Sequence, residues 1–131
     1  MNILYEKTAS GTVAEVGERL EKATADHGFG VLGVVDIKQK MNAKGVAFEP
    51  DCRIYEVCNP RRAKEVLEKD LSISTALPCR ISVYDEDGQT KLSTILPTEM
   101  LRLFQQPQLE SVAKDVEEQI AAIIDSAAEQ E

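Results

Sequence analysis

The sequence predicts an α+β fold: a curved, mainly antiparallel five-stranded sheet with helices packed on one face. Two observations predict it. Short runs rich in branched residues alternate with amphipathic patterns, and the runs at 79–84 and 90–96 flank Asp87-Gly88, a strong hairpin signal. Hairpin connections favour antiparallel pairing, which leaves one face of the sheet for the helices to cover.

The strands follow from apolar runs with alternating side chains, bounded by turn residues. Glycines in the run at 29–37 favour a bent strand, because glycine inside a strand often marks a bulge or a close backbone approach. The predicted strands are 2–6, 29–37, 52–58, 79–84 and 90–96.

The helices follow from apolar residues at helical spacing and from their terminal residues. Thr12 and Glu15 form a capping-box pattern, and Gly28 is a good helix stop. Asn59 followed by Pro60 is a favoured helix start. The predicted helices are 12–27, 60–69, a short piece over 97–104 and a long helix from 107, while 38–44 forms a short helix or a loop.

Length and composition predict one domain, residues 1–131, because single domains cluster at about 100–150 residues. Hydrophobic residues make up 43% of the chain and there is no tryptophan, so aliphatic side chains must fill the core. The formal net charge of −8 opposes contact with phosphate backbones, so we expect no nucleic-acid partner. The ordinary explanation of the acidic excess is solubility.

Cysteine and histidine usage points to a reducing compartment. The three cysteines lack a Cys-x-x-Cys spacing and do not suit a disulfide-rich secreted scaffold, and a single histidine, His27, argues against a structural zinc site. His27 is expected to end the first helix. We see no signal peptide and no apolar run of about 18 residues, so we expect a cytoplasmic protein without membrane contact.

The strand at 52–58 places a cysteine at the mouth of a helix. Alternation puts Cys52, Glu56 and Cys58 on one face of the strand, and Cys58 directly precedes the helix start at Asn59-Pro60. Free amides and the dipole at a helix N-terminus stabilise an anion, so this pattern predicts a lowered pKa and a reactive thiol at Cys58.

Two arginines occupy the first turn of the same helix, where the dipole disfavours cations. Arg61 and Arg62 either pair with Glu65 or Glu68, or hold an anion together with the amide ends. Glu56 is a candidate acid or base, although a solvated strand residue is the ordinary interpretation.

Cys79 begins the strand that follows this helix. If the strands of Cys58 and Cys79 are neighbours, the two thiols could form a redox pair or share a soft metal ion. The alternative is that both are small core residues, because cysteine is among the most buried residue types. Cys52 is expected to fill a strand position only.

Several of these segments closely resemble the bacterial and archaeal family known as domain of unknown function 302. The resemblance runs from about residue 3 to residue 104 and includes Phe29-Gly30-Val31-Leu32, Asp36-Ile37, Cys58-Asn59-Pro60, Leu77-Pro78-Cys79 and Val83-Tyr84. Cys52, Glu56 and Leu71 depart from the usual pattern, and the first two put any shared pocket around that strand in doubt.

The resemblance implies a single copy of the TATA-binding-protein-like fold, a strand, a helix, four strands and a helix, in proteins that form dimers. Residues 1–104 would be the family-like core, 60–69 an added helix and 107–129 a C-terminal helix. No established activity of the family transfers to this chain, and fold alone does not give function.

We therefore expect a binding module rather than an enzyme, which takes a small molecule or a protein partner in a groove near the Cys-Asn-Pro and Leu-Pro-Cys motifs. No cofactor is expected. The alternative is a thiol-based redox or soft-metal-binding protein that uses Cys58 and Cys79. The expected site residues are Cys58, Asn59, Arg61, Arg62, Cys79 and Glu56.

Overall fold

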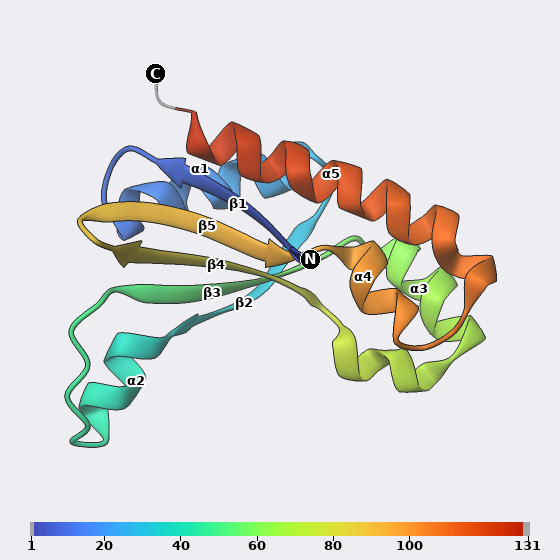
Figure 1. Cartoon of the computed structure of the whole chain (residues 1–131), viewed down its shortest axis with the longest axis horizontal. Helices are drawn as coiled ribbons and strands as arrows, with labels where there is room; N and C mark the ends of the chain where they lie inside the picture. Colours follow the sequence, from blue (N-terminus) through green and yellow to red (C-terminus); the bar gives the residue numbers. More distant parts are fainter. Residues whose placement is uncertain (1, 130–131) are drawn as a thin grey trace.

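The computed structural model describes residues 2–129 and contains one antiparallel sheet with helices packed on one side, as the sequence predicts (Figure 1). The strand order is β1-β5-β4-β3-β2, so β1 and β2 are the edges. The strands are β1 Leu4–Ala9, β2 Gly30–Asp36, β3 Cys52–Cys58, β4 Cys79–Glu86 and β5 Gln89–Ile95.

Helices and short 3₁₀ turns connect the strands. The helices are α1 Val13–Asp26, α2 Ile37–Ala43, α3 Pro60–Lys69, α4 Pro97–Arg102 and α5 Glu110–Ala128, and the 3₁₀ segments are η1 Leu71–Ala76 and η2 Pro107–Leu109. Segment 38–44 is thus mostly helical, and the connector expected after α3 contains the 3₁₀ segment η1.

The first strand begins later and runs further than its apolar residues indicate. The sequence predicts 2–6, whereas β1 pairs with β5 from Leu4, opposite Ile95, to Ala9, opposite Thr90. Its second half contains the polar, exposed residues Lys7 and Thr8, so no apolar pattern marks it in the sequence. Backbone pairing with β5 therefore decides the end of the strand.

The capping box predicted for α1 forms, and α2 has a side-chain cap that the sequence analysis did not identify. In α1 the Thr12 hydroxyl accepts from the Glu15 amide at 3.1 Å, and the Glu15 carboxylate accepts from the Thr12 amide at 2.8 Å. The Asp36 side chain caps α2 by accepting from the Gln39 amide at 3.0 Å. These side chains satisfy amides that a helix start leaves without a backbone partner.

The main core lies between the sheet and the two helices α1 and α5. Its fully buried side chains include Leu20 of α1, Tyr55 and Val57 of β3, and Ile123 of α5. Figure 1 shows α5 running along the same side of the sheet as α1. Burial of these apolar side chains is the main force that holds the two layers together.

A second, smaller apolar cluster lies beyond the end of the sheet, where α3, α4 and the start of α5 meet in Figure 1. Val66, Ile73, Leu109 and Val112 are buried in it, and Leu77, Leu101 and Phe104 pack against it. The cluster holds the loop-rich end of the molecule to the sheet and surrounds the candidate site.

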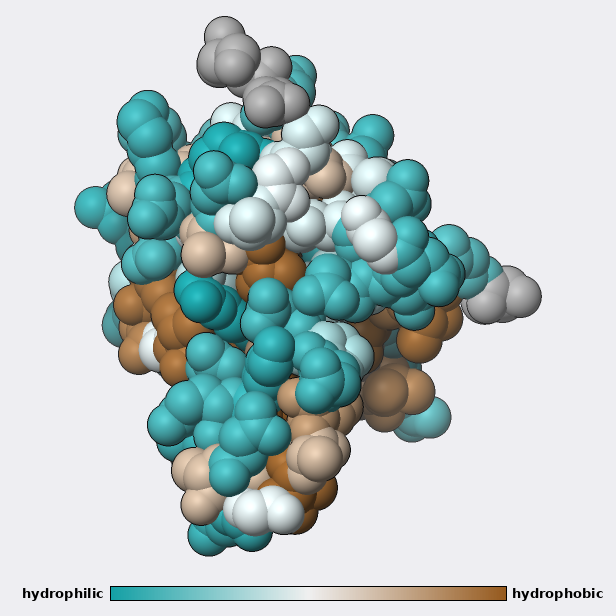
Figure 2. Space-filling view, turned by 90° about the vertical axis from the view of Figure 1, so that its left-hand side faces the viewer, coloured by the Kyte–Doolittle hydropathy of each residue, from teal (hydrophilic) through white to brown (hydrophobic). Residues whose placement is uncertain are grey.

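An arm formed by α2 and the loop that follows it, residues 44–51, projects at the opposite end (Figure 1). Met41 and Val46 are exposed on it, and Figure 2 shows hydrophobic and hydrophilic residues side by side at the bottom of the view, where the arm projects.

Within residues 2–129, no helix combines the length and apolar character needed to cross a membrane.

Candidate functional site

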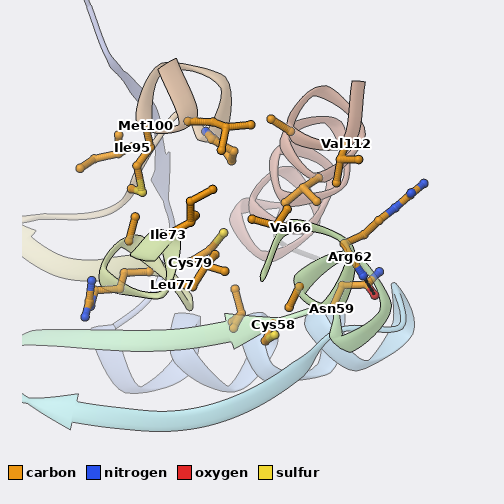
Figure 3. Close-up of a pocket in the computed structure, with 18 of the residues that line it drawn as sticks. Cys58, Asn59, Arg62, Val66, Ile73, Leu77, Cys79, Ile95, Met100 and Val112 are labelled. Atoms are coloured by element: carbon orange, nitrogen blue, oxygen red, sulfur yellow. Dashed lines mark hydrogen bonds between the residues drawn. The ribbon is translucent and has the colours of Figure 1, made fainter. Parts of the chain in front are cut away.

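A small cavity of about 80 Å³ lies between the end of the sheet and the second apolar cluster (Figure 3). Helices α3, α4 and α5, segment η1 and the adjoining ends of β3 and β4 contribute its walls. Most lining side chains are apolar, and they include Val66, Ile73, Leu77, Met100, Leu101 and Phe104. The cavity is therefore suited to an apolar group.

Four of the six residues expected at the site line this cavity. They are Cys58, Asn59, Arg62 and Cys79. The sequence motifs before α3 and before β4 do meet around one space, because β3 and β4 are neighbours with Val57 opposite Cys79. Arg61 and Glu56 are not among the lining residues.

The start of α3 does not offer free amides to an anion. The Asn59 side-chain oxygen accepts from the Arg61 amide at 3.1 Å and from the Arg62 amide at 3.3 Å. The cap residue thus satisfies the donors that would stabilise a thiolate or a bound anion.

The prediction that Cys58 has a lowered pKa is wrong. Burial raises the pKa of the Cys58 thiol, because a partly desolvated site disfavours the charged thiolate. Burial, assisted by the nearby Cys58, raises the pKa of Cys79 to about 11. Both thiols are neutral at physiological pH and add to the uncharged character of the cavity.

The two thiols do not face each other. Cys79 is opposite Val57 and shares its face of the sheet, whereas Cys58 follows Val57 and starts from the other face. In Figure 3 the Cys79 sulfur points toward Val66, and the Cys58 sulfur at the end of β3 does not point toward it. All three cysteines are free.

Arg62 is held by two carboxylates. Its guanidinium contacts Glu65 at 2.9 Å within α3 and Asp115 of α5 at 2.9 Å. These partners raise the pKa of Arg62 further above its already high ordinary value. Of the two explanations open from the sequence, pairing with an acidic residue therefore holds for Arg62, while Arg61 is exposed.

The remaining candidate residues have structural surroundings. Glu56 lies opposite Arg80 in the sheet register, with an N–O distance of 3.8 Å between the side chains. The His27 ring nitrogen Nδ1 lies 2.8 Å from the Ala23 carbonyl oxygen at the end of α1. No cluster of three metal-ligating side chains occurs in residues 2–129.

Sequence reasoning missed the wall of the cavity opposite the sheet. Ile73 lies in a segment expected to be a plain connector, and Met100, Leu101 and Phe104 lie in a short helical piece to which no site role was given. The available signal was the presence of large apolar residues in short segments that have no long amphipathic face of their own.

Comparisons with known proteins agree on a single family. The model of the family "Domain of unknown function DUF302" matches residues 5–127. The crystal structure of an uncharacterized conserved DUF302 protein from Bacillus stearothermophilus superimposes with a TM-score of 0.92 at 35% sequence identity, over 98% of this chain and 100% of that chain. Comparison with curated proteins finds no match. This chain belongs to the DUF302 family.

Proposed function

We propose that this protein is a binding module that takes up a small apolar group in the cavity between α3, α4, α5 and the sheet. The observation that supports this is the cavity itself, with about 80 Å³ of space and a largely apolar lining. An apolar cavity of about 150 Å³ stays dry and binds benzene, so a space about half that size suits a short aliphatic chain or a similarly small group.

The surroundings favour an uncharged group in the buried part of the ligand. The thiols of Cys58 and Cys79 are neutral because their pKa values are raised. The guanidinium of Arg62 is already paired with Glu65 and Asp115. The other charged side chain on the wall, Arg80, lies 3.8 Å from the Glu56 carboxylate, so both arginines of the wall have an acidic partner. A buried ionic group in the ligand would carry a large desolvation cost.

The proposal does not require chemistry. The raised pKa values of the thiols oppose a nucleophilic role, because the thiolate is the reactive form. The opposite starting faces of Cys58 and Cys79 give no support to the redox or soft-metal alternative. A non-enzymatic binding role uses the features that are present.

Binding of 1-butanol and xenon to the purified protein, followed by nuclear magnetic resonance shifts of the cavity methyl groups, tests the proposal. Ala63 lines the cavity, so Ala63→Leu should fill it and abolish binding. Ala121→Leu is the matched control, because Ala121 is a half-buried helical alanine that does not line the cavity. Absence of shifts in the unmodified protein, or equal loss in both variants, would overturn it.

We propose as well that the protein acts as a homodimer, in which a second copy covers the face of the sheet that carries no helix. Support comes from the half-buried apolar Ile54, which lies on the face opposite Tyr55. Analytical ultracentrifugation should give twice the chain mass, and Ile54→Glu should return the monomer. A monomer at all concentrations would exclude this assembly.

A further inference from the structure

The projecting arm, residues 37–51, presents apolar side chains that no other part of the described chain covers. Helix α2 has no buried residue, and residues 39–47 are all exposed. Met41 is 36% exposed and Val46 is 53% exposed. Apolar side chains on this projection contribute nothing to the core, so a surface role is the physical reason to look for.

The arm keeps a defined shape although it is exposed. The Val46 amide donates to the Met41 carbonyl oxygen at 2.9 Å, and the Phe48 amide donates to the Asn42 side-chain oxygen at 3.3 Å. These bonds fold the loop back onto the end of α2. They bring Met41 and Val46 next to each other, so the two apolar side chains form one small patch.

The arm is also the basic part of an acidic protein. Residues 37–48 include three lysines and no acidic residue, in a chain whose formal net charge is −8. Lys38 is paired with Asp51 at 3.5 Å. Lys40 and Lys44 are exposed and one helical turn apart, and neither makes an ion pair within residues 2–129. Two free ammonium groups therefore lie beside the apolar patch.

This combination is complementary to an anionic lipid surface. Lipid headgroups neutralise lysines, and the interfacial region takes up apolar side chains. A nucleic acid would use the lysines but leave Met41 and Val46 in water. A peptide partner usually lies in a groove, whereas the arm projects and the cavity is at the other end of the molecule (Figure 1).

The acidic remainder of the protein would be repelled by such a surface, but the arm holds it away. Helix α2 has seven residues and is about 10 Å long. This length is comparable to the screening length of about 8 Å at physiological salt. The repulsion is thus largely screened while the tip of the arm touches the surface.

We propose that the arm attaches the protein reversibly to membranes that contain anionic lipids. Met41 and Val46 enter the headgroup region, and Lys40 and Lys44 contact the anionic groups around them. Crossing a membrane needs a long apolar run but lying on its surface does not, so the absence of such a run does not exclude this contact. The cavity takes no part in the attachment.

Co-sedimentation with vesicles tests the charge complementarity. The protein should bind vesicles of phosphatidylcholine with about one third phosphatidylserine, and neither vesicles of phosphatidylcholine alone nor the mixed vesicles in molar salt. The double change Lys40→Gln and Lys44→Gln should weaken binding about 25-fold, or about fivefold for each lysine. Lys69→Gln with Lys114→Gln is the matched control, because it removes the same charge from exposed positions outside the arm. No binding to the mixed vesicles, or equal weakening in both double variants, overturns the proposal.

Fluorescence tests the insertion of the apolar patch. The chain has no tryptophan, so Met41→Trp places a single indole on the arm, and its emission should shift to shorter wavelength with the mixed vesicles. Leu71→Trp is the control, because Leu71 is 75% exposed in η1 at the other end, and it should not shift. No shift at position 41, or an equal shift at both positions, overturns the proposal.

Two other occupants of the arm give distinct results. A DNA duplex that binds as tightly as the mixed vesicles, with the same loss in the Lys40→Gln and Lys44→Gln variant, would identify a general polyanion site and overturn the lipid assignment. A change of this variant from dimer to monomer without vesicles would identify an interface between copies, and would overturn it as well. Cavity binding of 1-butanol is measured separately and stands or falls independently of these outcomes.

Discussion

The phenol of Tyr55, in the middle of β3, packs directly against Gly17 of α1. A side-chain carbon placed on Gly17 would overlap the Tyr55 phenol oxygen and lie 2.9 Å from the ring carbon Cζ. Tyr55 is only 2% exposed, so its ring is enclosed by the core. The absence of a side chain at Gly17 sets how closely α1 approaches the sheet.

Gly17→Ala should therefore destabilise the protein, although alanine is the better helix former by about 1 kcal/mol. We expect a net loss of about 1–3 kcal/mol in the free energy of unfolding, the usual cost of overpacking a core. Urea unfolding measures it. Gly30→Ala is the control, because a side chain there meets no atom within 4 Å, and it should change little.

A second variant tests the cause of that loss. Combining Gly17→Ala with Tyr55→Leu removes the phenol, so the alanine should cost less in this background than in the unmodified protein. An equal cost in both backgrounds would show that the Tyr55 contact does not explain the effect.

Arg62 of α3 reaches Asp115 of α5 through two nitrogens, with Nη2 at 2.9 Å and Nε at 3.0 Å from the same carboxylate oxygen. This pair links the added helix to the C-terminal one beside the cavity. Arg62→Gln should lower Tm by about 1–3 °C at low salt, a modest effect because both side chains are partly exposed.

The exposed pair Lys64 and Glu68 on the same helix gives the matched comparison for Arg62 and Asp115. A double-mutant cycle should show stronger coupling for Arg62–Asp115, weakening in molar salt, where the screening length falls to about 3 Å. Equal coupling in the two cycles would mean that the pair does not contribute to holding α3 in place.

The fold could be predicted because its signals are local. Alternation in β3 identified Tyr55 and Val57 as one face, and these residues are buried, while Asp87-Gly88 identified the turn between β4 and β5. Because these signals are local, they do not predict where a strand ends when pairing with another strand decides its end. Thr8 and Ala9 belong to β1 through pairing with β5, which no local pattern of residues shows.

The site was predicted in position but not in character. Neighbouring strands bring the two cysteine motifs together, which follows from the strand order. The predicted lowering of the Cys58 pKa was wrong because burial of the thiol raises it, and that burial depends on packing between segments that are distant in the sequence. Likewise, Leu101 reaches the cavity through packing between distant segments, which sequence spacing does not encode.

Tyr5 of β1 donates a 2.6 Å hydrogen bond from its hydroxyl to Asp125 of α5. This bond, burial of the hydroxyl and the charge of the neighbouring carboxylate raise the pKa of Tyr5 to about 12. An ultraviolet titration should show one tyrosine that ionises near this value, and Asp125→Asn should reduce its shift. Tyr5→Phe should cost about 0.5–1.5 kcal/mol of stability, limited by solvent screening. A titration without a late tyrosine would exclude the bond.

Cys79 should make the protein less stable at alkaline pH. Burial raises the pKa of its thiol from 9.0 to about 11, so between these values the unfolded chain releases a proton that the folded chain keeps. The stabilising contribution is complete below pH 9 and is lost as pH rises toward 11. Urea unfolding at several pH values should therefore show a steeper decline in the unmodified protein than in Cys79→Ala. Cys52→Ala, which leaves Cys79 in place, should keep the steeper decline. Ionisation of Tyr5 also lowers stability in this pH range, so the test compares the variants with the unmodified protein. Identical declines of stability with pH in all three proteins would mean that the Cys79 thiol has the same pKa in the folded and unfolded chain.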